Sequence, residues 1–326
     1  MIDTHYDLLS IAYVAYLKND YSYLEKISKY FHEKNVRGVI ANLYFMSEEE
    51  MIEELHPKYY QKDISVLEMF QIARKVLDTY LPETYILYSI EGADFIKNTE
   101  ELEKLYEAGL NSLIIAWNTR NKYASGNRSD QGLTGEGRKL LEKAISLGMG
   151  IDLSHANRNT FNDMVEFIRK KQEQGIDVCC YASHSNSRTL CNRERNLDDE
   201  QLRKIASIKG LVGVFSNRNF VVNEEVKDIV SDTEKKDAYL QHIDYIASII
   251  GKDNIMVATD DMDFCKDADS EYGLTAIYDY STIANTLSNQ LFRKYGEEAT
   301  YQIMYANAKE KVFEKIRNKR KNKGVK

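Results

Sequence analysis

The sequence has little of what separates domains. It holds two prolines and sixteen glycines in 326 residues, and it shows no repeat and no low-complexity tract. Pro57 and Pro82 both fall in connections between apolar segments. Nothing therefore marks a linker, and barrels of alternating strands and helices reach this length as single units. We expect one domain over residues 1–326.

Cysteine is also scarce, and its spacing excludes two classes of protein. Cys179, Cys180, Cys191 and Cys265 form neither a C-x-x-C pair nor the framework of a disulfide-rich secreted domain. The first residues are acidic and polar where a signal peptide needs a basic start and an apolar run. No apolar stretch reaches the length of a membrane span. We expect a cytoplasmic protein without membrane contact.

The chain lacks a broad positive charge. Lysine and arginine number 44 against 51 aspartates and glutamates, for a formal net charge of −7. Nucleic acid is therefore not an expected partner, and a small-molecule substrate fits better. Basic residues gather only near the end of the chain, and we expect residues 317–326 to be a frayed, solvated tail.

Short apolar runs rich in β-branched residues recur between longer segments of helical periodicity, as in a parallel sheet covered by helices. The eight runs are Ile2–Asp7, Val36–Phe45, Thr84–Glu91, Ser112–Asn118, Gly150–His155, Val178–His184, Leu211–Ser216 and Ile255–Asp260. The amphipathic segments include Glu136–Leu147, Phe161–Gln174, Asp198–Ile208, Ala238–Ile250, Tyr278–Phe292 and Ala299–Ile316. Eight strands predict a closed (β/α)8 TIM-type barrel with extra C-terminal helices. Periodicity alone leaves a doubly wound open sheet as the rival.

Ionisable residues at the ends of these runs favour the barrel, because the carboxyl ends of barrel strands meet on one face. The set is His5, Asp7, Glu91, His155, His184 and Asp260. His5 and Asp7 stand two apart and so point to the same side of a strand. Taken singly, each residue has an ordinary explanation, such as a salt bridge for Glu91, a hydrogen-bonded structural histidine, or a solvated acidic loop at Asp260.

Together, the six groups indicate a metal site. Imidazole and carboxylate ligands without thiolate suit zinc, manganese or iron. Six such groups exceed the three protein ligands that one catalytic zinc usually has. Two metal ions and a catalytic acid/base account for the whole set.

These residues lie in motifs that resemble those of the membrane (renal) dipeptidases, zinc-dependent enzymes of the amidohydrolase-like barrels with soluble bacterial members. The motifs are His5-x-Asp7, Ile90-Glu91-Gly92, Gly132-Leu133-Thr134, Asp152-Leu153-Ser154-His155, Ser183-His184-Ser185 followed by Arg195-Asn196, and Ala258-Thr259-Asp260. The likeness covers nearly the whole chain.

The resemblance implies a binuclear zinc dipeptidase, with other divalent metals as alternatives. Its implied metal ligands are His5 and Asp7 for one ion, His155 and His184 for the other, and Glu91 as the bridge. A metal-bridging hydroxide then attacks the scissile amide of a dipeptide, and Asp260 takes its proton and returns it to the leaving amine. Arg195 grips the substrate carboxylate. A homodimer is also compatible with the resemblance.

The fourth strand departs from the family pattern. Mammalian members carry a histidine there that contacts the substrate carbonyl, whereas this sequence has Trp117 and Asn118. We expect both to line the substrate site, with an indole N–H in place of a chargeable imidazole. Two alternatives stay open: a metal-dependent hydrolase of another small amide, a lactone or an N-acyl amino acid, and a catalytically silent binding barrel. The remaining histidines are expected to be structural or solvent-facing, namely His32, His56 and His242.

Overall fold

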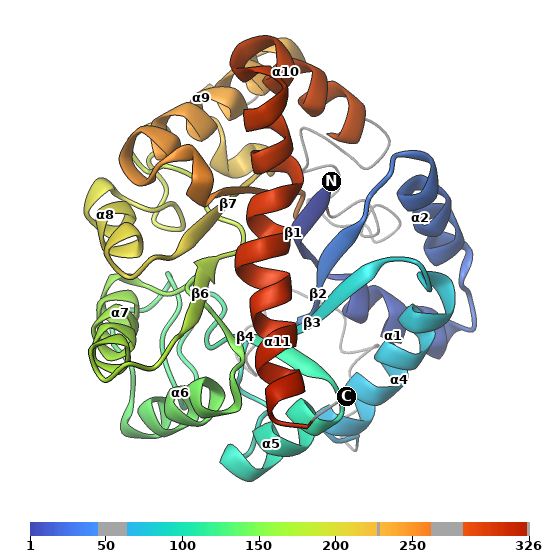
Figure 1. Ribbon diagram of the computed structural model, residues 1–326, viewed down its shortest axis with the longest axis vertical. Helices are drawn as coiled ribbons and strands as arrows, with labels where there is room; N and C mark the ends of the chain where they lie inside the picture. Colours follow the sequence, from blue (N-terminus) through green and yellow to red (C-terminus); the bar gives the residue numbers. More distant parts are fainter. Residues whose placement is uncertain (45–63, 227–228, 262–282, 325–326) are drawn as a thin grey trace.

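The computed structural model describes residues 1–44, 64–226, 229–261 and 283–324. Its strands follow one another around a closed parallel barrel in chain order, and β8 returns to pair with β1 (Figure 1). The strands are β1 (Ile2–Tyr6), β2 (Gly38–Tyr44), β3 (Tyr85–Glu91), β4 (Leu110–Ile114), β5 (Gly150–Asp152), β6 (Cys179–Ala182), β7 (Leu211–Phe215) and β8 (Ile255–Ala258). Closure excludes the open sheet and confirms the predicted (β/α)8 barrel.

Several strands end before the polar residues that were expected to close them. β5 ends at Asp152 and β8 at Ala258, and beyond these ends His155 (φ 64°) and Asp260 (φ 48°) adopt left-handed backbone conformations. β4 ends at Ile114, and the chain beyond it folds back so that the N–H of Arg128 donates to the carbonyl of Asn118. Within the predicted second run, Phe45 lies outside the described residues.

Helices surround the barrel (Figure 1). They are α1 (Leu8–Lys18), α2 (Ser22–Glu33), α4 (Val66–Tyr80), α5 (Thr99–Glu107), α6 (Gly135–Leu147), α7 (Arg158–Glu173), α8 (Asp199–Ser207) and α9 (Asp232–Ile250), with short turns η2 (Arg218–Phe220) and η3 (Lys252–Asn254). Apolar residues on their inner faces and on the strands form one large core cluster.

Hydrogen-bonded caps fix where helices begin. Asp198 and Gln201 form a reciprocal capping box, so α8 begins directly after Asp198, where the predicted segment Asp198–Ile208 starts. A second capping box, between Ser231 and Glu234, starts α9 at Asp232 rather than at Ala238. The predicted helix over 136–147 is also capped, because the side chain of Thr134 accepts a hydrogen bond from the backbone of Gly137.

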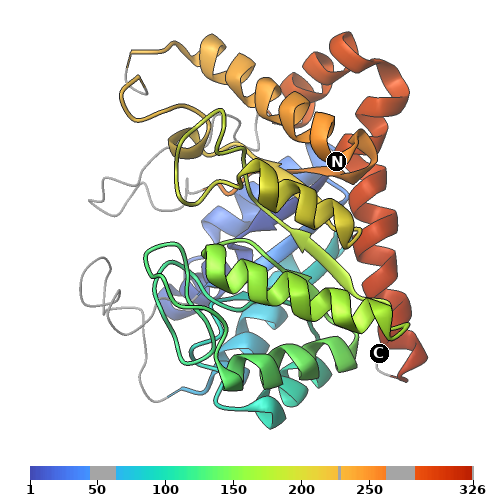
Figure 2. The same ribbon diagram turned by 90° about the vertical axis from the view of Figure 1, so that its left-hand side faces the viewer.

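The C-terminal helices cover the end of the barrel where the strands begin (Figures 1 and 2). They are α10 (Ile283–Tyr301), the π-helical turns η5 (Gln302–Ala306) and η6 (Lys309–Glu314), and α11 (Lys315–Asn322). Phe313 and Ile316 pack there against Ile2 and Leu87. Gly296, with φ 82°, kinks α10. Residues 278–282 of the predicted segment lie outside the described residues.

The expectation of a frayed basic tail is wrong for residues 317–322, which continue α11. Arg320 is buried, its guanidinium donates to the carbonyls of Tyr106 and Leu110, and it lies over the Tyr106 ring. These contacts explain the difference, because a long cationic side chain can pack its stem against a ring and satisfy its donors with backbone carbonyls.

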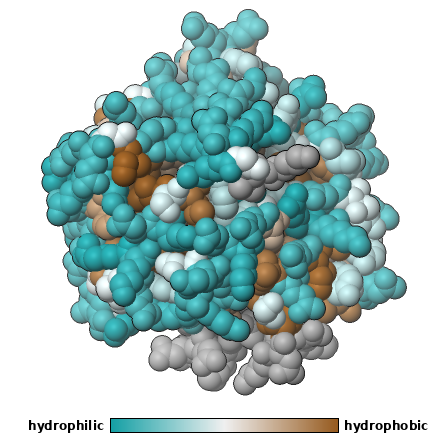
Figure 3. Space-filling model, turned by 60° about the horizontal axis from the view of Figure 1, so that its bottom comes forward, coloured by the Kyte–Doolittle hydropathy of each residue, from teal (hydrophilic) through white to brown (hydrophobic). Residues whose placement is uncertain are grey.

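Among the described residues, none of the helices combines the length and the apolar character that crossing a bilayer requires. The face in Figure 3 is mainly hydrophilic, and its apolar residues appear in small separate areas. Scattered apolar residues of this kind are normal and identify no partner.

Candidate metal centre

The six ionisable residues chosen from the sequence meet at the carboxyl ends of the strands. They come from β1 or just after it (His5, Asp7), from the end of β3 (Glu91), and from the loops after β5 (His155), β6 (His184) and β8 (Asp260). His5, Glu91 and His184 are almost fully buried, whereas the side chains of Asp7 and Asp260 keep 17% exposure. The group is therefore reachable from solvent on the side of the two aspartates.

Glu91 divides the site into two halves. Its Oε2 atom lies 3.1 Å from Nε2 of His5, and Nε2 of His5 lies 3.8 Å from Oδ1 of Asp7. Its Oε1 atom lies 2.8 Å from Nε2 of His155 and 3.7 Å from Nε2 of His184. Each oxygen of one carboxylate thus faces a different pair of ligand-type side chains.

Both halves have the spacing of a metal site. In each, one donor atom from every member lies within 4.8 Å of the others. Two ligand atoms at tetrahedral angles around a zinc ion stand roughly 3.4 Å apart, given zinc–ligand distances near 2.1 Å. The Nε2 atoms of His155 and His184 are 3.0 Å apart. The distances from the Glu91 oxygens to the three histidine nitrogens run from 2.8 to 3.7 Å, a range that includes the spacing expected for zinc ligands.

The same atoms lack other partners. Among the described residues, Nε2 of His5, Oδ1 of Asp7 and Oε1 of Glu91 are buried and have no hydrogen-bond partner outside this group of ligand-type side chains. Buried polar atoms of this kind are rare, because each one costs free energy. Divalent cations in the two halves would satisfy all three atoms, so the donor set fits a pair of metal ions.

The electrostatics of the site also favour added positive charge. Burial raises the pKa of Asp7, and the nearby carboxylate of Glu91 raises it further. Burial opposes the charged form of His5, but Glu91, Asp7 and Asp260 outweigh it and raise the His5 pKa to about 10. Burial lowers the pKa of His155 to about 4. Metal cations would relieve the repulsion between the carboxylates and would accept the neutral imidazole as a ligand.

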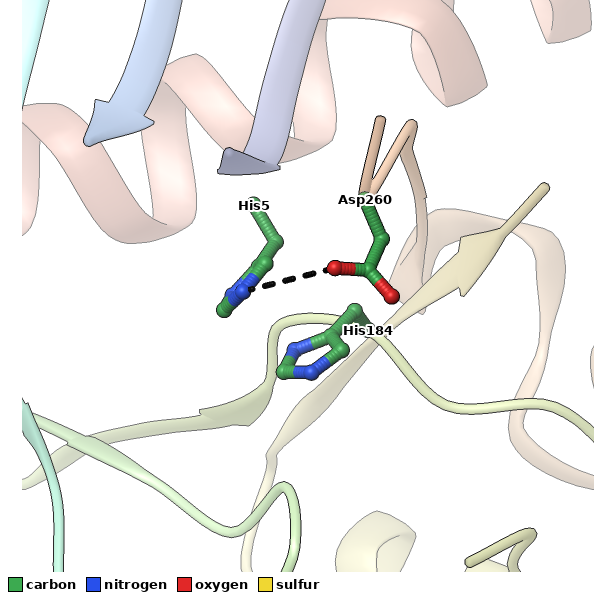
Figure 4. A group of neighbouring side chains, drawn as sticks. All are labelled: His5, His184 and Asp260. Atoms are coloured by element: carbon green, nitrogen blue, oxygen red, sulfur yellow. Dashed lines mark ion pairs between the residues drawn. The ribbon is translucent and has the colours of Figure 1, made fainter. Parts of the chain in front are cut away.

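Asp260 faces the site from the loop after β8. Figure 4 shows its carboxylate beside the rings of His5 and His184, and Oδ1 lies 3.9 Å from Nε2 of His5. The side-chain amide of Asn217 donates to Oδ2 at 3.4 Å, and the N–H of Asp260 donates to the carbonyl of His5. Burial is the main cause that raises the pKa of Asp260. A partly exposed carboxylate with a raised pKa is suited to proton transfer.

Arg195 lies under the site and is 6% exposed. Nη2 donates to the carbonyl of His184 at 2.8 Å, Nη1 donates to the hydroxyl of Ser185 at 3.1 Å, and the guanidinium carbon lies 5.5 Å from the centre of the Phe215 ring. Burial lowers the pKa of Arg195 to about 10. Within the described residues no carboxylate lies within ion-pair distance of its guanidinium, although the charges of Glu91, Asp260 and Asp152 act on it from further away.

Comparison with known sequences identifies the family. The model of the membrane dipeptidase family, peptidase family M19, matches residues 32–324. The chain belongs to the membrane dipeptidase family. The match begins after β1, so that His5 and Asp7 precede it and rest on the geometry above.

Two curated proteins are similar to part of the chain. The Klebsiella pneumoniae protein described as "Uncharacterized protein in pqqA 5'region" is 33% identical over 180 residues, which are 52% of this chain and 62% of that protein. The Acinetobacter calcoaceticus protein described as "Uncharacterized protein in PQQ-III 3'region" is 31% identical over 170 residues, 49% of this chain and 50% of that one. The chain thus spans about half to three fifths of the length of these curated relatives.

A solved structure shares the fold over its whole length. It is a metallopeptidase from Rhodobacter sphaeroides liganded with a phosphinate mimic of the dipeptide L-Ala-D-Ala, with a TM-score of 0.72, 18% identity, and coverage of 97% of this chain and 98% of that one. At this identity the likeness carries the fold alone.

Trp117 and Asn118, the residues after β4 that depart from the family pattern, both lie beside His155. The Trp117 ring lies edge-on to Tyr44, with ring centres 4.8 Å apart, and 6.0 Å from the His155 ring. Oδ1 of Asn118 lies 3.2 Å from Nδ1 of His155. Asn118 therefore contacts Nδ1 of a ligand-type histidine, and its role as a substrate contact stays a prediction. Trp117 is half-buried beside the site.

The sequence analysis did not identify two buried aspartates that accept hydrogen bonds from the backbone at or next to the site residues. Asp3 is buried and accepts hydrogen bonds from the backbone of His5 and Thr259. Asp152 accepts from the backbone of Ser154 and Ser183. The signal was present, because both aspartates sit inside apolar strand runs, where a carboxylate needs partners.

The other histidines were expected to be structural or solvent-facing. His242 in α9 is fully buried, where Nδ1 accepts the N–H of Ser187 and Nε2–H donates to the carbonyl of Val221, so it is structural. His32 is exposed in the last turn of α2. His56 lies outside the described residues.

Proposed function

We propose that this chain hydrolyses the amide bond of small dipeptides with a pair of divalent metal ions, zinc first among them. The observation that carries the proposal is the division of the Glu91 carboxylate between two sets of ligand-type atoms. The ligands are His5 and Asp7 for one ion, His155 and His184 for the other, and Glu91 for both. Membership of a dipeptidase family supports the reaction class.

Two bound ions lower the pKa of a water molecule and polarise the scissile carbonyl. The protein's own groups supply the rest. Asp260 acts as the acid/base: its carboxylate accepts the proton of the attacking water and returns it to the leaving nitrogen. Its partial exposure leaves room for substrate, and Asn217 holds Oδ2, so that Oδ1 stays turned toward His5.

Arg195 binds the free carboxylate of the dipeptide. Its guanidinium is fixed by the carbonyl of His184 and by Ser185, so little conformational entropy is lost when the substrate binds. A planar fork suits a carboxylate better than a lysine would. This contact distinguishes dipeptides, which end in a carboxylate beside the scissile bond, from longer peptides.

A second candidate keeps the metals and changes the substrate to another small amide, a lactone or an N-acyl amino acid. The aromatic pair of Tyr44 and Trp117 beside His155 favours it, because an apolar wall suits an acyl chain. Trp117 and Asn118 as substrate contacts stay predictions. So do a homodimer and a cytoplasmic setting, although the thiols of the described cysteines are free, as a reducing compartment requires.

One experiment separates these functions. Purified protein with added zinc is offered dipeptides with L or D residues at the second position, together with N-acyl amino acids and lactones. We expect cleavage of dipeptides that a chelator abolishes and zinc restores. Cleavage of N-acyl amino acids or lactones alone favours the second candidate. Absence of any metal-dependent cleavage above an Asp260→Asn variant contradicts both.

A further inference from the structure

A single buried hydroxyl lies between the two halves of the metal centre. Oγ of Ser183 is 2.8 Å from Nδ1 of His184 and 3.2 Å from Nδ1 of His5. The two imidazole rings have centres 3.5 Å apart and planes tilted by 30° to each other. Ser183 is fully buried, so its hydroxyl must find its partners inside the protein.

The chemistry of a ligand histidine defines what this hydroxyl does. The Nε2 atoms of His5 and His184 both point toward Glu91. A neutral imidazole that binds a metal through Nε2 carries its proton on Nδ1, and this N–H needs an acceptor. A serine hydroxyl has two acceptor lone pairs and one donor, so Ser183 can accept from both rings and donate to Ser154, whose Oγ is 3.4 Å away.

Three strands hold the hydroxyl in place. The N–H of Ser183 donates to Oδ1 of Asp152 at 3.0 Å, and its carbonyl accepts the hydroxyl of Thr4 at 2.7 Å. On the far side, a Cβ atom at Gly213 would meet the Ser183 carbonyl oxygen at 1.8 Å, so only glycine lets β7 approach this closely. The backbone at Ser183 is thus fixed from β5, β1 and β7.

The other side chains that contact an Nδ1 atom of a ligand-type histidine contact one ring each. Asn118 contacts only His155 in this way. The amide of Asn42 lies 3.1 Å from Nδ1 of His5, and a half-turn of this amide would present its carbonyl oxygen, which has no partner among the described residues. Ser183 alone in the described part of the chain contacts Nδ1 atoms from both halves of the centre.

We propose that Ser183 is a positioning residue shared by the two metal sites: its hydroxyl accepts the Nδ1–H of His5 and of His184, and so sets the affinity of both sites together. This inference rests on the proposed binuclear function. It predicts that removing the Ser183 hydroxyl changes the binding affinity of both metal ions, although the two ions have different histidine ligands.

The test compares zinc affinities in four variants of the full chain. The zinc-loaded proteins are titrated with a chromophoric chelator, which resolves the two dissociation constants. In Ser183→Ala we expect both ions to bind about 10- to 100-fold more weakly, the usual cost of losing an outer partner of a ligand histidine. Asn118→Ala should weaken only the ion held by His155, and Asn42→Ala only the ion held by His5.

Ser112→Ala is the matched control. It removes another fully buried strand hydroxyl, whose partners are the Gly150 carbonyl and the Tyr181 hydroxyl, away from the ligand histidines. It should leave both zinc affinities unchanged even if it lowers the melting temperature. A purely structural role of Ser183 would give the same result as this control.

The possible outcomes distinguish failure of the Ser183 proposal from failure of the proposed binuclear function. Wild-type protein that binds two zinc ions, with a Ser183→Ala variant that binds both as tightly or loses only one, overturns the shared role and leaves the proposed function standing. Wild-type protein that binds fewer than two zinc ions overturns both. If the alanine variant does not fold, Ser183→Cys replaces it, because a thiol fills the space but accepts hydrogen bonds weakly and should weaken both ions.

Discussion

The guanidinium of Arg195 lies over the ring of Phe215, 5.5 Å from its centre. This contact and the hydrogen bonds to the loop after β6 hold a buried positive charge that no described carboxylate pairs with. The arrangement resembles a binding site for an anion more than a structural ion pair, because an ion pair would bring its own counter-charge.

Arg195→Lys is therefore expected to lower kcat/KM for dipeptides about 10- to 100-fold, mainly through KM, since a lysine cannot form the two parallel hydrogen bonds. Steady-state kinetics on a dipeptide and on its C-terminal amide measure this. The amide should be a poor substrate for both proteins and should respond little to the substitution. Equal losses on both substrates would contradict a carboxylate contact.

Asp260→Asn is expected to lower kcat about 10²- to 10⁴-fold while zinc content stays the same. The amide keeps the size of the side chain but cannot take up a proton. Metal analysis beside kinetics is needed, because Asp260 also lies within ligand distance of His5 and His184. Loss of zinc from the variant would make Asp260 a ligand and would remove its assignment as the acid/base. Asp232→Asn, at a side chain that is 92% exposed, is the control.

His242 should make the free energy of unfolding depend on pH. Burial lowers its pKa to about 4, so the unfolded chain binds a proton between pH 6.5 and 4 that the folded chain does not. The contribution is complete above pH 6.5 and is lost as pH falls, by about 2 kcal/mol at pH 5. Urea unfolding of wild type and His242→Gln, both with chelator, tests this. The stability difference between the two should shrink on acidification; a constant difference would contradict it.

Arg320→Ala should destabilise the fold by about 2 kcal/mol, because the buried guanidinium hydrogen bonds to Tyr106 and Leu110 are lost and the Tyr106 ring loses its covering cation. Arg317→Ala, at an exposed position of the same helix, should cost much less. Calorimetric melting of both variants provides the comparison. Similar melting temperatures for the two would mean that the end of α11 does not contribute to stability.

Much of the fold is readable from the sequence because strand and helix periods are local. The run that ends at Glu91 predicts β3 to within one residue, and the amphipathic segment Asp198–Ile208 predicts α8 to within one residue at each end. The convergence of the ionisable residues follows from barrel closure, a general property of parallel strands. Their roles as ligands stay predictions.

The hydrogen bonds behind the site could not be read in this way. Ser183 meets His5 across 178 positions of the chain, and Asp3 meets Thr259 across 256. No local pattern reports such pairs. The left-handed turn at His155 was also invisible, because histidine adopts it only where tertiary contacts compensate for the strain. The end of α11 was predicted wrongly because its charge pattern resembles a solvated tail, whereas Arg320 is buried and donates to the carbonyls of Tyr106 and Leu110.

The most direct test of the account is a crystal structure of the zinc-loaded protein with anomalous diffraction recorded on both sides of the zinc edge. The account predicts two anomalous peaks on opposite sides of the Glu91 carboxylate, one bonded to His5 and Asp7 and the other to His155 and His184. A single peak, or peaks bonded to other residues, would contradict it.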